Sequence, residues 1–144
     1  MEAQVSRILA IAAALASGAW AQEKSPASVW DGIYTDAQAS RGQTGYGKSC
    51  ASCHGEKLEG QGQAPPLAGA DFLSNWNGMS VGDLFDQIQA TMPADRPGQL
   101  SKAANADILA YILKMNHFPP GQKELPADSE ALKKVRIETA KPQN

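Results

Sequence analysis

Two cysteines and a histidine within five consecutive residues are the part of this 144-residue chain best suited to chemistry. The pentapeptide Cys50-Ala51-Ser52-Cys53-His54 holds both cysteines of the chain and one of its two histidines. Two thiols three positions apart on one helical turn can each form a thioether with a haem vinyl group, and the next residue can ligate the iron through an imidazole nitrogen. The pattern therefore predicts one covalently attached haem c, held by Cys50, Cys53 and His54.

Three other kinds of site compete for this pentapeptide. A structural zinc ion needs four ligands, and only His117 remains outside the motif to join them. A thioredoxin-like redox pair follows a strand, whereas the preceding residues have the pattern of a helix. A plain disulfide between Cys50 and Cys53 would leave His54 without a role. Haem attachment is the interpretation that uses all three residues.

Four side chains are candidates for the second axial ligand. Met115 falls on the apolar face of a predicted helix, Met79 has a packing role at the start of another, and His117 follows a helix end. Met92 stands before Pro93 in a predicted loop, and no apolar pattern explains it. A thioether is a soft ligand, and methionine–histidine ligation raises the reduction potential of a haem. We expect Met92 to complete the coordination, the alternative being a loop methionine without a role.

Two further residues are candidates for contacts around the haem. The carbonyl of Pro65 is free of any helix, so it either accepts a hydrogen bond from the second ring nitrogen of His54 or belongs to a simple rigid turn. Such a bond would fix the tautomer of the ring and raise its basicity. Trp76 is expected in a loop, where its indole N–H would bond a haem propionate or its ring would pack in the core.

The first of three main helices is predicted to carry the motif. It begins at Thr35, with Gln38 as the second member of a capping box, and runs into Cys50. Glycines tolerated in a helix usually indicate close packing. Because Gly42 and Tyr46 are four positions apart and share a face, another helix can approach closely at Gly42.

The second and third helices are predicted from caps and apolar stripes. Ser80 and Asp83 form a capping box for the second, which ends at the Met92–Pro93 pair. The third begins at Ser101 and ends at Asn116. Their core-facing stripes are Val81, Leu84, Phe85 and Ile88, and Ile108, Tyr111, Ile112 and Met115.

Residues 1–21 have the pattern of a secretory signal peptide. Arg7 supplies a positive charge, a short apolar run follows, and Ala-Trp-Ala at 19–21 fits the cleavage site, so the mature chain would begin at Gln22. An uncleaved anchor is the alternative. The formal net charge is −2 with no basic run, which argues against nucleic acid, and no second apolar stretch reaches membrane length. We expect export to the periplasm and no membrane span after cleavage.

The mature chain is expected to form one domain with two appendages. Residues 22–35 are an arm that Trp30 and Tyr34 fasten to the domain, and residues 36–118 are the domain itself. Residues 119–144 are a tail, expected to form a short helix near 128–135 and to lie over the surface.

Residues 36–118 resemble a class I monohaem cytochrome c. The haem motif ends a first helix, a proline–leucine element and a loop methionine follow, and an aromatic helix closes the domain. The resemblance implies an all-α cytochrome c fold with three main helices and loops wrapped around one haem. It also implies that Gly42 and Tyr46 cross Ile108 and Tyr111, and that Pro65, in the P-x-L element at 65–67, is the acceptor for His54.

The same resemblance implies single-electron transfer rather than catalysis. With both axial positions of the iron filled, no site remains for a substrate, so we expect a carrier and not an enzyme. Trp30-Asp31-Gly32 and residues 64–69 are similar to bacterial cytochromes that accompany quinoprotein alcohol dehydrogenases. This implies a dehydrogenase as electron donor and an oxidase or another cytochrome as acceptor. The alternatives are a haem subunit of an oxidoreductase complex or a peroxidase of low activity.

Overall fold

The structure is a computed structural model that describes residue 26 and residues 28–143. Within these residues the chain is helical, with three isolated β-bridges and no strand, so the predicted all-α fold is confirmed. The predicted signal peptide lies outside the described residues. The elements are η1 (Val29–Asp31), α1 (Asp36–Ser49), α2 (Ala51–His54), α3 (Ala70–Trp76), α4 (Val81–Thr91), α5 (Lys102–Met115) and α6 (Ser129–Leu132).

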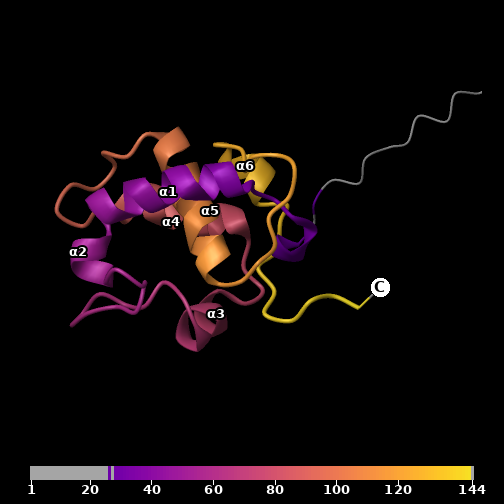
Figure 1. The fold of residues 1–144 in the computed structure, drawn as a ribbon, viewed down its shortest axis with the longest axis horizontal. Helices are drawn as coiled ribbons and strands as arrows, with labels where there is room; N and C mark the ends of the chain where they lie inside the picture. The colour runs from indigo at the N-terminus through magenta and orange to yellow at the C-terminus, as the bar shows by residue number, and fades with distance from the viewer. Residues whose placement is uncertain (1–25, 27, 144) are drawn as a thin grey trace, which may run out of the picture.

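Helices α1 and α5 cross at the centre of the molecule (Figure 1). A Cβ atom on Gly42 would lie 1.8 Å from the carbonyl oxygen of Asp107, so only glycine allows the two backbones to approach this closely. One turn further along α1, the rings of Tyr46 and Tyr111 pack with their centroids 5.4 Å apart. The predicted crossing is confirmed. Gly47, by contrast, has open space around it and plays no part in the crossing.

The start of α1 differs from the predicted capping box. The side chain of Thr35 accepts a hydrogen bond from the backbone N–H of Gln38, as expected. The Gln38 side chain does not return to Thr35. It is buried, and it donates to the carbonyl of Leu125 and accepts from the N–H of Leu125. The box prediction was wrong for Gln38 because a buried amide finds two backbone partners in the tail that local sequence does not reveal.

Helices α4 and α5 begin where the caps predicted. The Ser80–Asp83 capping box is complete, and Ser101 accepts from the N–H of Ala104 at the start of α5. The predicted stripe of α4 is buried. Helix α5 is buried on more than its predicted stripe, because Asn105, Ala106, Leu109, Ala110 and Leu113 are also buried. It is therefore the central helix, in contact with α1 on one side and α4 on another.

The arm and the tail meet at one end of the molecule, on the right in Figure 1. The Trp30 indole donates to the carbonyl of Glu138 at 2.9 Å, and its ring meets Phe118 edge to face. The Tyr34 hydroxyl donates to the Phe118 carbonyl at 2.6 Å. Both aromatic residues therefore fasten the arm, as predicted. We call residues 28–34 together with residues 118–139 the terminal cluster.

The tail is part of the core, and the prediction of a surface tail was wrong. Leu125, Leu132, Val135 and Ile137 are all buried. The backbone of residues 135–137 pairs with two other segments. On one side the N–H of Val29 donates to the carbonyl of Arg136, and on the other side backbone hydrogen bonds join residues 135 and 137 to residues 78–81. The predicted helix is present but shorter, as α6. These four apolar side chains bury because α4 and the arm leave an apolar face that the tail covers.

Candidate functional site

The pentapeptide lies at a bend between two helices. Cys50 ends α1, where its N–H donates to the carbonyl of Tyr46, and it also begins α2, where its carbonyl accepts from the N–H groups of Cys53 and His54. The backbone of Cys50 is not helical, with φ −128° and ψ −37°. The chain therefore changes direction at the first cysteine, and the second cysteine and the histidine occupy a separate turn.

The two thiols are free and lie in different environments. Cys50 is half-buried, whereas Cys53 is exposed. Burial, and then the neighbouring Cys53, raise the pKa of the Cys50 thiol to about 11. Redox-active cysteine pairs instead have a lowered pKa and follow a strand, whereas a helix precedes this motif. The local structure thus differs from that of a thioredoxin-like site.

The His54 ring is held in one orientation. The residue is 7% exposed, and Nδ1 lies 2.8 Å from the carbonyl oxygen of Pro65. A carbonyl can only accept, so Nδ1 donates this hydrogen bond and, in the neutral ring, Nε2 keeps its lone pair. The hydrogen bond expected between His54 and Pro65 is present. Two free thiols and an imidazole with Nε2 available form a donor set that fits a covalently attached haem.

The loop after the motif is fixed by short-range bonds. The Tyr46 hydroxyl donates to the carbonyl of Gly55 at 2.7 Å, and the N–H of Gly60 donates to the carbonyl of His54 at 2.7 Å. Burial raises the pKa of Tyr46, so the hydroxyl keeps the proton that it donates. Gly55 has φ +83°, a backbone conformation that favours glycine and sends the chain away from α2. These contacts fix the position of the backbone that carries His54.

The other candidate ligands differ in placement. Met92 is the residue after α4, with an extended backbone and a partly buried side chain that packs against the core. Met79 is 40% exposed, Met115 is partly buried on α5, and His117 is exposed. The interpretation of Met92 as a loop residue outside the apolar stripes agrees with this placement, and its role as a ligand stays a prediction.

Trp76 is the last residue of α3, so its expected position in a loop was wrong. Its ring lies 6.3 Å from that of Phe72, one turn earlier in the same helix. The short helix forms because residues 70–76 lack glycine and proline, although no apolar stripe long enough to predict it is present. A contact between Trp76 and a propionate stays a prediction.

A set of apolar side chains is only partly buried although it packs against the core. A flat apolar group can be covered by such side chains, which would exclude water from it. Several come from the motif, from the Pro65–Gly69 segment and from the two ends of the loop after α4. The set is Trp30, Cys50, Ala51, Leu67, Ala68, Leu73, Trp76, Met92, Leu100 and Met115.

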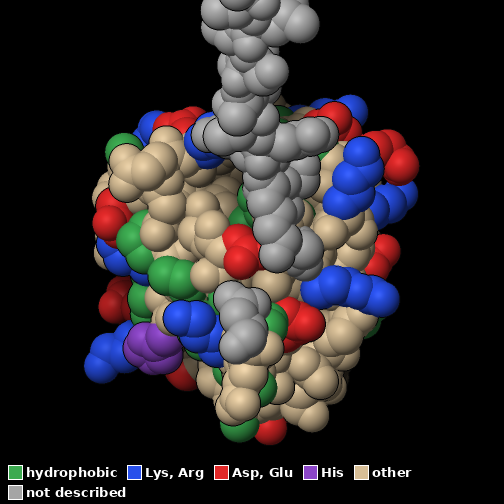
Figure 2. All heavy atoms as spheres, turned by 90° about the vertical axis from the view of Figure 1, so that its right-hand side faces the viewer, with side chains coloured by type: hydrophobic (Ala, Val, Ile, Leu, Met, Phe, Trp, Pro, Cys, Tyr) green, Lys and Arg blue, Asp and Glu red, His purple; other side chains and the backbone are tan. Residues whose placement is uncertain are grey.

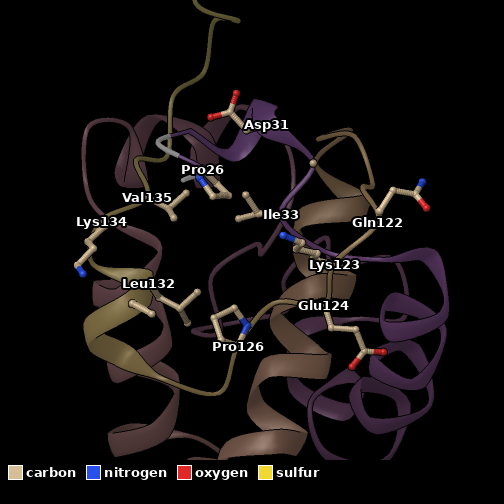
Figure 3. Close-up of a pocket in the computed structure, with 12 residues that line it drawn as sticks. Pro26, Asp31, Ile33, Gln122, Lys123, Glu124, Pro126, Leu132, Lys134 and Val135 are labelled. Carbon is tan, nitrogen blue, oxygen red and sulfur yellow. The ribbon is translucent and has the colours of Figure 1, made fainter. Parts of the chain in front are cut away.

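A separate cavity of about 660 Å³ lies in the terminal cluster, away from the motif. Figure 3 shows Pro26, Ile33 and Val135 converging on it from the arm and the tail. Figure 2 shows the end of the molecule that carries these segments, where acidic and basic side chains alternate without one dominant sign. The cavity is therefore not part of the candidate haem site.

Among residues 26 and 28–143, no three His, Cys, Asp or Glu side chains lie together as a group that could hold a metal ion. In the same part of the chain, every helix is too short or too polar to span a membrane.

Comparison with known proteins places the motif in a family. The family model described as "Cytochrome C oxidase, cbb3-type, subunit III" matches residues 37–112, which is more than half of the chain. Cytochrome c-554(547) of Halothiobacillus neapolitanus is 58% identical over 31 residues, which are 22% of this chain and 34% of that protein. The chain thus matches about a third of the length of this curated relative.

Among solved structures, the sulfane dehydrogenase SoxCD from Paracoccus pantotrophus is similar with a TM-score of 0.48 and 21% identity. The match covers 75% of this chain and 61% of that one.

Proposed function

Because the chain belongs to the cytochrome c family, whose members carry a covalently bound haem c and transfer electrons, we propose that it is a periplasmic single-electron carrier. In this proposal Cys50 and Cys53 would form the thioethers to a haem, and His54 and Met92 would ligate its iron. The observation that carries it is the 2.8 Å contact between His54 Nδ1 and the Pro65 carbonyl, which leaves Nε2 free to bind iron.

Each residue has a defined task in this proposal. A bound haem supplies a one-electron couple. The Pro65 carbonyl keeps the proton on Nδ1 of His54 and raises the basicity of the ring. The Met92 thioether favours the reduced state, because sulfur is a soft ligand. The partly buried Leu67 and Ala68, which follow the Pro65 acceptor, would cover a bound haem and exclude water from it. With both axial positions filled the protein would transfer electrons and catalyse no reaction of its own.

We propose a dehydrogenase, such as a quinoprotein alcohol dehydrogenase, as the donor, and an oxidase or another cytochrome as the acceptor. The proposed division of the chain is a signal peptide at 1–21, an arm at 22–35, the cytochrome domain at 36–118 and a tail at 119–144. The second candidate is a haem subunit of an oxidoreductase complex, because the matching family is described as an oxidase subunit. Native purification separates the two: a monomer supports the carrier, and a stable complex with a dehydrogenase or oxidase supports the subunit.

Replacing either cysteine tests the attachment. Cys50→Ala or Cys53→Ala should abolish stable haem attachment, because each thioether anchors one vinyl group. The measurement is haem staining after denaturing electrophoresis, with Ser52→Ala as the control that should stain like the wild type. Full staining of the double cysteine variant would contradict covalent attachment at this motif.

Replacing Met92 tests the distal ligand. A ferric haem with bound methionine sulfur has a weak long-wavelength absorption band, and Met92→Ala should remove it and lower the reduction potential. Met79→Leu and Met115→Leu are the controls and should keep the band, since leucine fills similar space. Loss of the band in either control, with retention in Met92→Ala, would reassign the ligand.

A further inference from the structure

We propose that Asn116 is a positioning residue that sets the hydrogen bond between His54 and Pro65, and thereby the reduction potential. The inference rests on the proposed function, in which His54 is the proximal ligand. The sequence pattern marks Asn116 only as the end of a helix. In the structure it is 5% exposed and links the end of α5 to the Pro65–Gly69 segment.

The Asn116 amide makes three hydrogen bonds that fix its orientation. Nδ2 donates to the carbonyl of Leu67 at 3.0 Å and to that of Ile112 at 2.9 Å, and Oδ1 accepts from the N–H of Gly69 at 3.1 Å. Exchanging Nδ2 and Oδ1 would place the amide oxygen against two carbonyl oxygens. The three partners therefore determine which atom is the nitrogen and which the oxygen. The Ile112 bond fixes the side chain to its own helix, and the other two hold the segment.

The segment that carries the acceptor has few other anchors. Pro65 and Pro66 have no N–H group, so neither can donate a backbone hydrogen bond. After the acceptor carbonyl, the first backbone donor is Leu67, whose N–H bonds the carbonyl of Leu58 at 2.8 Å. Asn116 bonds the carbonyl of Leu67 and the N–H of Gly69. The position of the Pro65 carbonyl is therefore fixed by the loop on one side and by α5, through Asn116, on the other.

The two partners of the hydrogen bond are thus held by two tightly packed helices. His54 ends α2, which directly follows α1, and the Pro65 segment is held by Asn116, which follows α5. Helices α1 and α5 are in backbone contact at Gly42 and Asp107. Without the Asn116 amide, the Pro65 carbonyl would keep only its loop anchors, and the bond to Nδ1 would become longer or less populated. A weaker bond makes the imidazole a weaker donor to the iron, so the ferric state loses stabilisation and the potential rises.

The test uses the haem-loaded protein and two variants. Asn116→Leu removes all three hydrogen bonds at similar volume, and Asn116→Ser keeps one hydroxyl and is the milder change. We expect both to raise the reduction potential. In the reduced protein, NMR should show the Nδ1 proton of His54 exchanging with deuterium roughly tenfold faster in Asn116→Leu, as expected when a buried hydrogen bond opens more often.

Gln38→Met is the matched control. Gln38 is also a buried amide that bonds backbone at two points, but its partner is Leu125 in the tail. This variant should lower the melting temperature while the potential and the Nδ1 exchange rate stay at wild-type values. If the Asn116 variants lower the melting temperature in the same way, with the other two values unchanged, the inference is wrong. Failure of the proposed function would be visible earlier, as a wild-type protein without stained haem.

Discussion

The segment of residues 50–69 and the terminal cluster are built by opposite means. In the first, apart from the bonds of Asn116, the side-chain contacts are local: His54 bonds Pro65 eleven positions away, and Tyr46 bonds Gly55 nine positions away. In the second, Trp30 bonds Glu138 across 108 positions, and the corresponding separation for Ser28 and Glu138 is 110. The chemistry of this protein is therefore encoded locally, whereas much of its core is closed by the two ends of the chain.

The difference has an energetic meaning. The local segment leaves apolar side chains partly exposed and depends on hydrogen bonds, each contributing on the order of 1 kcal/mol net. The tail part of the terminal cluster buries Leu125, Leu132, Val135 and Ile137, each contributing roughly 1.5–3 kcal/mol. Changes to the tail should affect folding, whereas changes to the segment should affect the haem.

Removing the tail should have the largest effect. A chain that ends at Gln122 loses all four buried side chains, and their summed contribution is comparable to the whole stability of a domain, about 5–15 kcal/mol. We expect it not to fold cooperatively, as measured by circular dichroism during urea unfolding. A chain that ends at Ala140 is the control, since residues 141–143 are exposed, and it should unfold like the wild type. Cooperative unfolding of the shorter chain at the wild-type midpoint would show that the tail is dispensable.

Two glycines on α1 test the close contact between α1 and α5. Gly42→Ala places a Cβ atom 1.8 Å from the Asp107 carbonyl oxygen, so the helices must move apart, and we expect a loss of about 1–3 kcal/mol or more. Gly47→Ala meets nothing within 4 Å and should stabilise by up to about 1 kcal/mol through helix propensity. The measurement is the free energy of unfolding in urea. Equal effects of the two substitutions would contradict the close approach at Gly42.

Replacing Tyr34 should have the smallest effect, a change in how stability depends on pH under alkaline conditions. Burial, and then Asp36, raise the pKa of Tyr34 to about 12, whereas in the unfolded chain the tyrosine has its ordinary pKa of 10.0. Between these values the unfolded state loses a proton that the folded state keeps, so stability is complete below pH 10 and decreases as the pH rises toward 12. Tyr34→Phe should unfold with a weaker dependence on pH in this range, measured as the urea midpoint at several pH values. An unchanged dependence would mean that Tyr34 does not contribute to it.

The sequence by itself determined the parts that rest on short-range rules. The C-x-x-C-H motif, the caps at Thr35, Ser80 and Ser101, and the end of α4 at Met92 follow from residues within about four positions of each other. The bond from His54 to Pro65 is one of two alternatives that the residues alone leave open, and the resemblance to class I cytochromes c selects it. Gly42 was identified because a glycine inside a helix needs a packing reason.

Only the tertiary structure decided where the tail, Gln38, Asn116 and Trp76 lie. The tail alternates apolar and charged residues over too few positions to show a face, and it is buried because the arm and α4 form its partner surface. Gln38 and Asn116 are polar residues whose partners lie 87 and 49 positions away, and no local pattern marks a side chain that bonds distant backbone. Such contacts depend on which segments the packing of α1 against α5 brings together, and this is a property of the whole fold.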